Sequence, residues 1–71
     1  MKYGVVLFHT TTSALRAEKT AVRAGLQVKL VPTPRHLSSD CGIALRFAWD
    51  DRDTLTALLA EAGVEGDLHS L

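Results

Sequence analysis

The order of apolar stretches along the chain predicts an α+β fold, in which two helices cover one face of a four-stranded antiparallel sheet. Residues 3–8 form an almost continuous apolar run, residues 43–49 alternate between large apolar and other side chains, and two helical stretches each end at a glycine. A length of 71 residues is enough for one small core, so we assign residues 1–71 to a single small α/β sandwich domain.

The first part of the chain predicts a strand followed by a helix. Residues 3–8 are typical of a buried strand, and the polar turn at residues 9–13 offers several helix N-caps. Residues 13–24 have a helical period, and Gly25 is placed to end that helix. Its predicted apolar stripe consists of Ala14, Leu15, Ala21, Val22 and Gly25. Glu18 falls near the middle of that stripe, which is unusual for a charged residue.

The second part predicts two strands, a helix and a short final strand. Residues 27–31 form the first of these strands, and the period of two at residues 43–49 is the clearest strand signal in the chain. Aspartates at residues 50–53 suit the start of a helix, which Gly63 then ends. Residues 64–71 form a weak last strand.

Six elements in this order predict a ferredoxin-like β-α-β-β-α-β open-faced sandwich with strand order 4-1-3-2. In that topology the connection between the second and third strands lies at the same end of the sheet as the turn into the first helix. The loop that contains Cys41 would therefore face His9 and the N-terminus of the helix.

Composition excludes several classes of partner. Eight basic and eight acidic side chains cancel, so the chain lacks the positive field of a nucleic-acid-binding or membrane-surface protein. No apolar stretch is long enough to span a membrane. The single cysteine cannot form an internal disulfide, which fits a reducing compartment, and we expect a cytoplasmic protein.

The residues around Cys41 suggest a reactive thiol. The side chains able to act on it share its loop or its end of the sheet: Arg35, His36, Ser38, Ser39, Asp40, Gly42 and His9. Nearby cations lower a thiol's pKa and favour the nucleophilic thiolate, whereas the adjacent Asp40 opposes that effect. The alternative is that Cys41 is a small buried structural residue, because free cysteines are often buried.

Four segments resemble one family of small bacterial proteins, the selenium/sulfur carrier-like proteins. They are Ala-Leu-Arg-Ala-Glu at residues 14–18, Pro-Thr-Pro-Arg at residues 32–35, Ser-Ser-Asp-Cys-Gly at residues 38–42 and Ala-Leu-Arg-Phe at residues 44–47. The similarity covers essentially the whole chain, and Cys41 matches the cysteine proposed to carry sulfur or selenium.

The resemblance implies a carrier or accessory protein rather than an enzyme. Cys41 would accept a sulfane sulfur or selenium atom from a cysteine desulfurase or a selenium-donor enzyme and pass it to an acceptor protein. The only cofactor expected is then a covalent persulfide or selenosulfide on Cys41 itself.

Other candidate sites receive less support from the sequence. Glu18 and Arg46 are expected to form a structural ion pair or to reach solvent, the alternative being that Arg46 steers an anionic group toward the cysteine. His9, His36 and Cys41 match no metal-site spacing, so we predict no metal centre. A chain of this size also leaves little room for a Cys-His hydrolase site.

The alternative function is a non-catalytic regulatory or protein-interaction module in which the cysteine is structural. Both faces of the strand at residues 3–8 look apolar, and this sandwich leaves one sheet face uncovered. An exposed apolar face usually marks a contact surface, so the sequence predicts a homodimer or a partner interface there.

Overall fold

The computed structural model describes residues 2–37 and 42–71. Its elements, in chain order, are β1 (Tyr3–Leu7), α1 (Thr11–Arg23), β2 (Val28–Pro32), β3 (Ile43–Ala48), the short 3₁₀ helix η1 (Trp49–Asp51), α2 (Arg52–Ala62) and β4 (Asp67–Ser70). The predicted β-α-β-β-α-β order is confirmed, with one turn of 3₁₀ helix added between β3 and α2.

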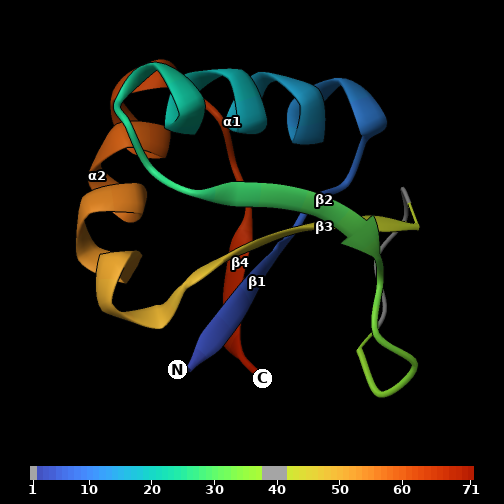
Figure 1. Ribbon diagram of the computed structural model, residues 1–71. Coiled ribbons are helices and arrows are strands. Elements are labelled where there is room, and N and C mark those ends of the chain that lie inside the picture. Colours follow the sequence, from blue (N-terminus) through green and yellow to red (C-terminus); the bar gives the residue numbers. More distant parts are fainter. Residues whose placement is uncertain (1, 38–41) are drawn as a thin grey trace.

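The four strands form one antiparallel sheet in the order β2-β3-β1-β4. This is the predicted order, and both helices cover the same face of the sheet, as in a ferredoxin-like open sandwich (Figure 1). The register places Leu7, the last residue of β1, opposite both Ala44 at the start of β3 and Asp67 at the start of β4. The β2–β3 loop and the β1–α1 turn therefore lie at one end of the sheet. None of the described helices is long and apolar enough to cross a membrane.

The main core lies between the sheet and the helices. It takes Val6, Leu45 and Phe47 from the sheet, Phe8 from the residue after β1, and Ala14, Ala17, Ala21, Leu55 and Leu59 from the helices, all of them buried. A second, smaller cluster of Val5, Leu7 and Ala44 lies on the opposite face of the sheet, and it is also buried. Because residues alternate faces along a strand, β1 is apolar on both sides, as its sequence predicted.

The predicted apolar stripe of α1 is wrong in part. The residues that contact the core are Ala14, Ala17 and Ala21, whereas Leu15 is 50% exposed and Val22 is 58% exposed. Alanines at this spacing face one side of a helix and let α1 approach the sheet closely. The larger apolar side chains are therefore displaced to the flank of α1, beside the half-buried Glu18.

The ends of the helices follow the sequence closely, apart from the aspartates before α2. The side chain of Thr10 caps α1 by accepting a hydrogen bond from the Ser13 N–H at 3.1 Å. Asp51 precedes α2, but its side chain makes no capping hydrogen bond. The turn into α2 is held instead by Arg52, which donates to the Trp49 carbonyl at 3.0 Å and lies over the Trp49 ring.

Candidate functional site

The loop between β2 and β3 closes at a backbone hydrogen bond. The Thr33 N–H donates to the Gly42 carbonyl at 3.1 Å, which continues the β2–β3 ladder by one residue pair beyond Pro32 and Ile43. Inside the loop, the Leu37 N–H donates to the Pro34 carbonyl at 3.0 Å and forms a tight turn. Both ends of the loop that contains Cys41 are thus anchored by backbone hydrogen bonds of described residues.

The first half of the loop folds onto the helix-free face of the sheet. Figure 1 shows residues 33–37 on the side of the sheet opposite the helices, and Leu37 packs there against the cluster of Val5, Leu7 and Ala44. Val5 and Ala44 are fully buried. The apolar side chains of β1 that led to a predicted interface on this face are therefore buried within the chain itself. A homodimer stays a prediction, but these side chains do not supply its contact surface.

Cys41, Ser38, Ser39 and Asp40 lie outside the described residues, so their roles stay sequence predictions. Gly42, the next residue, is described, and it is exposed with a φ of 72°. A Cβ atom at this position would meet nothing within 4 Å. Glycine is favoured here by its backbone conformation, since other residues rarely adopt positive φ, and not by lack of space.

Arg35 and His36 are exposed on the described half of the loop. Both side chains are open to solvent, where an approaching protein can reach them. The structure therefore gives the cysteine loop an exposed basic segment that is anchored to the sheet by the adjacent Leu37.

His9 lies at the expected end of the sheet, two residues beyond the end of β1. It lines a cavity of about 430 Å³ together with residues of α2 and of the segment leading into β4, among them Leu59, Glu65 and Asp67. Because β4 flanks β1 on the side opposite β3, this cavity is on the other side of β1 from the β2–β3 loop. His9 thus shares the end of the sheet with that loop but is grouped with α2 and β4.

Arg46 lies in the middle of β3 on the helix-free face, opposite Lys29 of β2 and Val5 of β1. Its guanidinium carbon is 4.8 Å from the centroid of the Tyr3 ring. Tyr3 begins β1 and pairs with Ala48, so it lies at the end of the sheet away from the cysteine loop. The guanidinium is held toward that far end, an arrangement that favours a structural role for Arg46.

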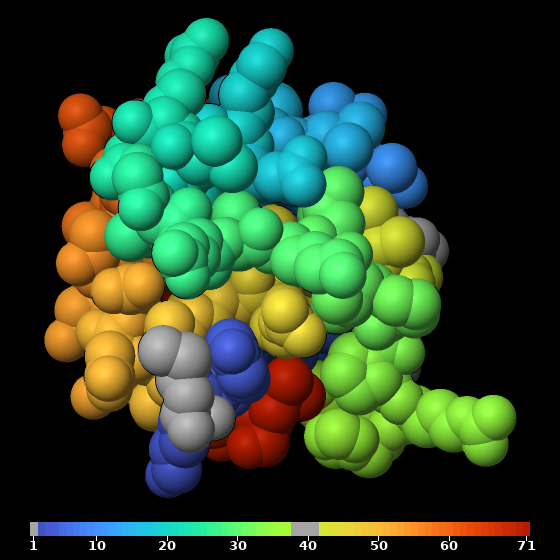
Figure 2. Space-filling model, in the orientation of Figure 1, coloured from blue at the N-terminus to red at the C-terminus, as the bar shows by residue number. Residues whose placement is uncertain are grey.

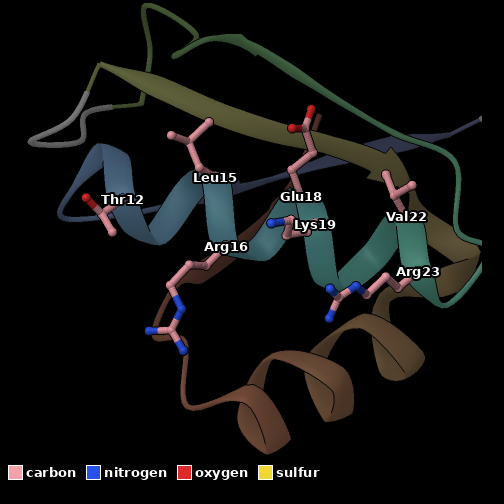
Figure 3. Close-up of a pocket in the computed structure, with 7 residues that line it drawn as sticks. All are labelled: Thr12, Leu15, Arg16, Glu18, Lys19, Val22 and Arg23. Carbon is pink, nitrogen blue, oxygen red and sulfur yellow. The ribbon is translucent and has the colours of Figure 1, made fainter.

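Glu18 lines a groove on α1 that the sequence did not indicate. The groove has a volume of about 550 Å³ and is lined by α1 residues alone: Thr12, Leu15, Arg16, Glu18, Lys19, Val22 and Arg23 (Figure 3). Leu15, Glu18 and Val22 point away from α2, whereas Arg16 points toward it and donates to the Ala62 carbonyl at 3.0 Å. The alanine spacing in α1 was the signal that could have revealed this exposed apolar flank.

Metal-ligating side chains do not gather in the described part of the chain. Among residues 2–37 and 42–71, no group of three or more His, Cys, Asp or Glu side chains could hold a metal ion. Since His9 and His36 come from separate parts of that end of the sheet, the geometry of the described residues gives no support to a His-based site.

Comparison with known proteins identifies the family. A family model described as "Putative Se/S carrier protein-like" matches residues 3–68 of the 71-residue chain. No curated protein and no solved structure gives a significant match. The match spans every strand and helix, from β1 into β4, together with the whole β2–β3 loop. The chain therefore belongs to the Se/S carrier protein-like family.

Proposed function

We propose that this protein carries sulfur or selenium on Cys41 between a donor enzyme and an acceptor protein. The observation that supports this most directly is that the only cysteine of the chain falls within the segment matched by the Se/S carrier family model. The loop around it is anchored at both ends and presents basic side chains to solvent.

Loading would proceed by thiol exchange. The Cys41 thiolate attacks the terminal sulfur of a donor persulfide, so that a new bond forms from the cysteine sulfur to that atom and the donor S–S bond breaks. The electron pair of the broken bond leaves with the donor thiolate, and Cys41 becomes a persulfide without net oxidation. A selenium atom would be carried in the same way as a selenosulfide.

Unloading repeats this exchange in the opposite sense. A thiolate of the acceptor attacks the terminal atom, and Cys41 leaves as a thiolate ready for another cycle. Since the chain has no second cysteine, the atom has to pass to another protein. This favours a carrier over an intramolecular redox enzyme.

Arg35 and His36 are proposed to assist both steps. Cations near a thiol stabilise the thiolate and lower its pKa, which raises the nucleophilic fraction near neutral pH. Both side chains are exposed on the half of the loop held by Leu37, so they can also contact acidic groups of a docking partner. We place this exchange in the cytoplasm, where thiols stay reduced.

The test measures the intact mass of the protein after incubation with a cysteine desulfurase and cysteine. We expect an added sulfur atom on the wild type and none on Cys41→Ser, followed by loss of the adduct when an acceptor thiol protein is added. The same assay with a selenium donor distinguishes the two cargoes. Arg35→Gln is the matched variant for the basic segment, and it should slow loading without unfolding the domain, because Arg35 is exposed.

The alternative is an interaction module with a structural cysteine, and the exposed Leu15 and Val22 on α1 favour it. Under that function the wild type would acquire no adduct, Cys41 would alkylate slowly in the folded protein, and Cys41→Ser would retain all partner binding. This combination of results would exclude the carrier function.

A further inference from the structure

We propose that a second copy of this chain binds at the outer edge of β2 and the adjoining flank of α1. The two four-stranded sheets would join into one sheet of eight strands about a two-fold axis. This inference is independent of the carrier chemistry, and it uses a different surface from the helix-free face of the sheet.

The outer edge of β2 offers backbone groups for another strand. β2 is the terminal strand of the sheet, with β3 on its inner side. Along an antiparallel strand, every second residue directs its backbone N–H and C=O toward the neighbouring strand. Because Thr33 bonds to Gly42, the residues of β2 that bond to β3 are Val31 and Lys29. The N–H and C=O groups of Val28 and Leu30 therefore point outward. Pro32 also falls at an outward position, where its missing N–H costs no bond to β3.

These outward groups match those of a second, antiparallel β2. With the two-fold axis at Leu30, the two copies of Leu30 exchange both backbone hydrogen bonds. The Val28 N–H of each copy then faces the Pro32 carbonyl of the other. The proline at the end of β2 thus acts as an acceptor, and its lack of an N–H is compatible with this pairing.

The flank of α1 beside β2 supplies the side chains. Leu15, Glu18 and Val22 point away from α2 (Figure 3), and α1 lies directly above β2 on one continuous face of the molecule (Figure 2). Leu15 and Val22 are at least half exposed. An exposed apolar pair beside a strand edge that no other described strand pairs with is typical of a contact surface.

The sequence of this flank is complementary to itself. Antiparallel α1 helices related by a two-fold axis between residues 18 and 19 place Glu18 opposite Lys19 of the second copy. Leu15 precedes Glu18 by three residues and Val22 follows Lys19 by three, so the same axis places Leu15 opposite Val22 of the second copy. One symmetry operation pairs opposite charges at the centre and apolar side chains on both sides, and this selects a second copy over an unrelated partner.

The spacing of the helices agrees with that of the strands. α1 packs on β2 and β3 alike, and neighbouring strands are about 4.8 Å apart. The two-fold axis runs midway between the two β2 strands, half a strand spacing from each. If α1 lies above the midline of β2 and β3, its axis is half a spacing on the other side of β2, and so about 5 Å from the two-fold axis. The two α1 helices are then about 10 Å apart. This is an ordinary distance for packed helices, so β2 pairing and α1 packing can occur together.

The experiment is sedimentation equilibrium of the full chain from low micromolar to near-millimolar concentration. We expect a monomer–dimer equilibrium for the wild type, and Leu15→Asp should weaken the dimer about 30-fold or more because it buries a charge in the interface. Ala57→Asp, which makes a similar change on the exposed face of α2, should leave the equilibrium unchanged. Far-ultraviolet circular dichroism confirms that each variant is folded.

A charge exchange tests the symmetry itself. Glu18→Lys and Lys19→Glu should each weaken the dimer, since like charges then face each other, whereas the double variant should restore it. In the dimer the amides of Val28 and Leu30 should also exchange hydrogen more slowly than in dilute monomer. A wild type that stays monomeric throughout, or a dimer indifferent to Leu15→Asp and both charge reversals, would overturn the proposal.

Discussion

The indole ring of Trp49 lies directly over the backbone of Gly4. A Cβ atom built at Gly4 would lie 2.5 Å from Cε3 of Trp49 and 2.9 Å from the His69 carbonyl oxygen. Gly4 is in β1 between β3 and β4, and Trp49 stacks on Phe47 with ring centroids 5.8 Å apart. The absent side chain at Gly4 therefore makes room for the aromatic pair that closes this end of the core.

Gly4→Ala is expected to lower the free energy of unfolding by about 1–3 kcal/mol, because the added methyl group overpacks the site. Chemical denaturation measures the change. Trp49→Leu should reduce the penalty of Gly4→Ala when the two substitutions are combined, since a smaller side chain can move away from the methyl group. Equal penalties in both backgrounds would show that Trp49 is not what restricts this position.

Thr10→Ala is expected to destabilise the domain by about 1 kcal/mol, because the Ser13 N–H at the start of α1 loses its side-chain acceptor. Thr12→Ala is the matched control, since Thr12 is an exposed residue in the first turn of α1 and no capping bond is lost. Thermal unfolding of the two variants makes the comparison. A loss for Thr12→Ala as large as that for Thr10→Ala would contradict the capping role.

Leu37→Ala is expected to lower the free energy of unfolding by about 1–2 kcal/mol, less than a fully buried leucine would, because Leu37 is only half buried over Val5, Leu7 and Ala44. Removal of this contact also frees the first half of the loop from the sheet. In Leu37→Ala we therefore expect Cys41 to be alkylated at a rate different from that in the wild type. In the Thr12→Ala control the alkylation rate should equal that of the wild type. An unchanged rate would mean that Leu37 stabilises the sheet without positioning the loop.

Arg46→Met is expected to leave sulfur transfer unchanged and to lower stability by about 0.5–1 kcal/mol, the usual range for a cation–π contact at a partly exposed site. The physical reason is that the guanidinium lies over Tyr3, at the far end of the sheet from the cysteine loop. Loading and unloading rates of the variant, measured beside its unfolding curve, separate the two roles. Slower transfer at unchanged stability would instead support a steering role for Arg46.

The sequence predicted the order of elements and the topology because the spacing of apolar residues and the glycines that end helices are local signals. The alternation in β3, the glycines after both helices and the polar turn that caps α1 each depend on a few neighbouring residues. The sheet order followed because few topologies suit six elements connected in this way.

Two features were missed from the sequence, because each depends largely on contacts between distant segments. The flank position of Leu15 and Val22 depends on how closely three alanines let α1 approach the sheet, which the period of the helix alone does not determine. The small cluster of Val5, Leu7 and Ala44 is packed against Val31 and against Leu37, a loop residue far away in sequence that lies on the face expected to be open. Arg35, His36 and Gly42 lie in the β2–β3 loop, as the order of elements implied, and their roles beside Cys41 stay predictions. The orientation of Arg46 toward Tyr3 requires the three-dimensional register.

The hydrogen bond from Thr33 to Gly42 completes the ladder of β2 and β3 before the loop begins. Residues 34–41 are thus inserted between two strands whose register is already determined, and among the described residues Leu37 is the loop side chain that packs against buried strand residues. Loops of different length or charge could be exchanged at this point without altering the pairing of any strand, provided that an apolar residue keeps the place of Leu37. The scaffold thereby separates the proposed docking loop from the strands and helices that keep the chain folded, so the two can change independently.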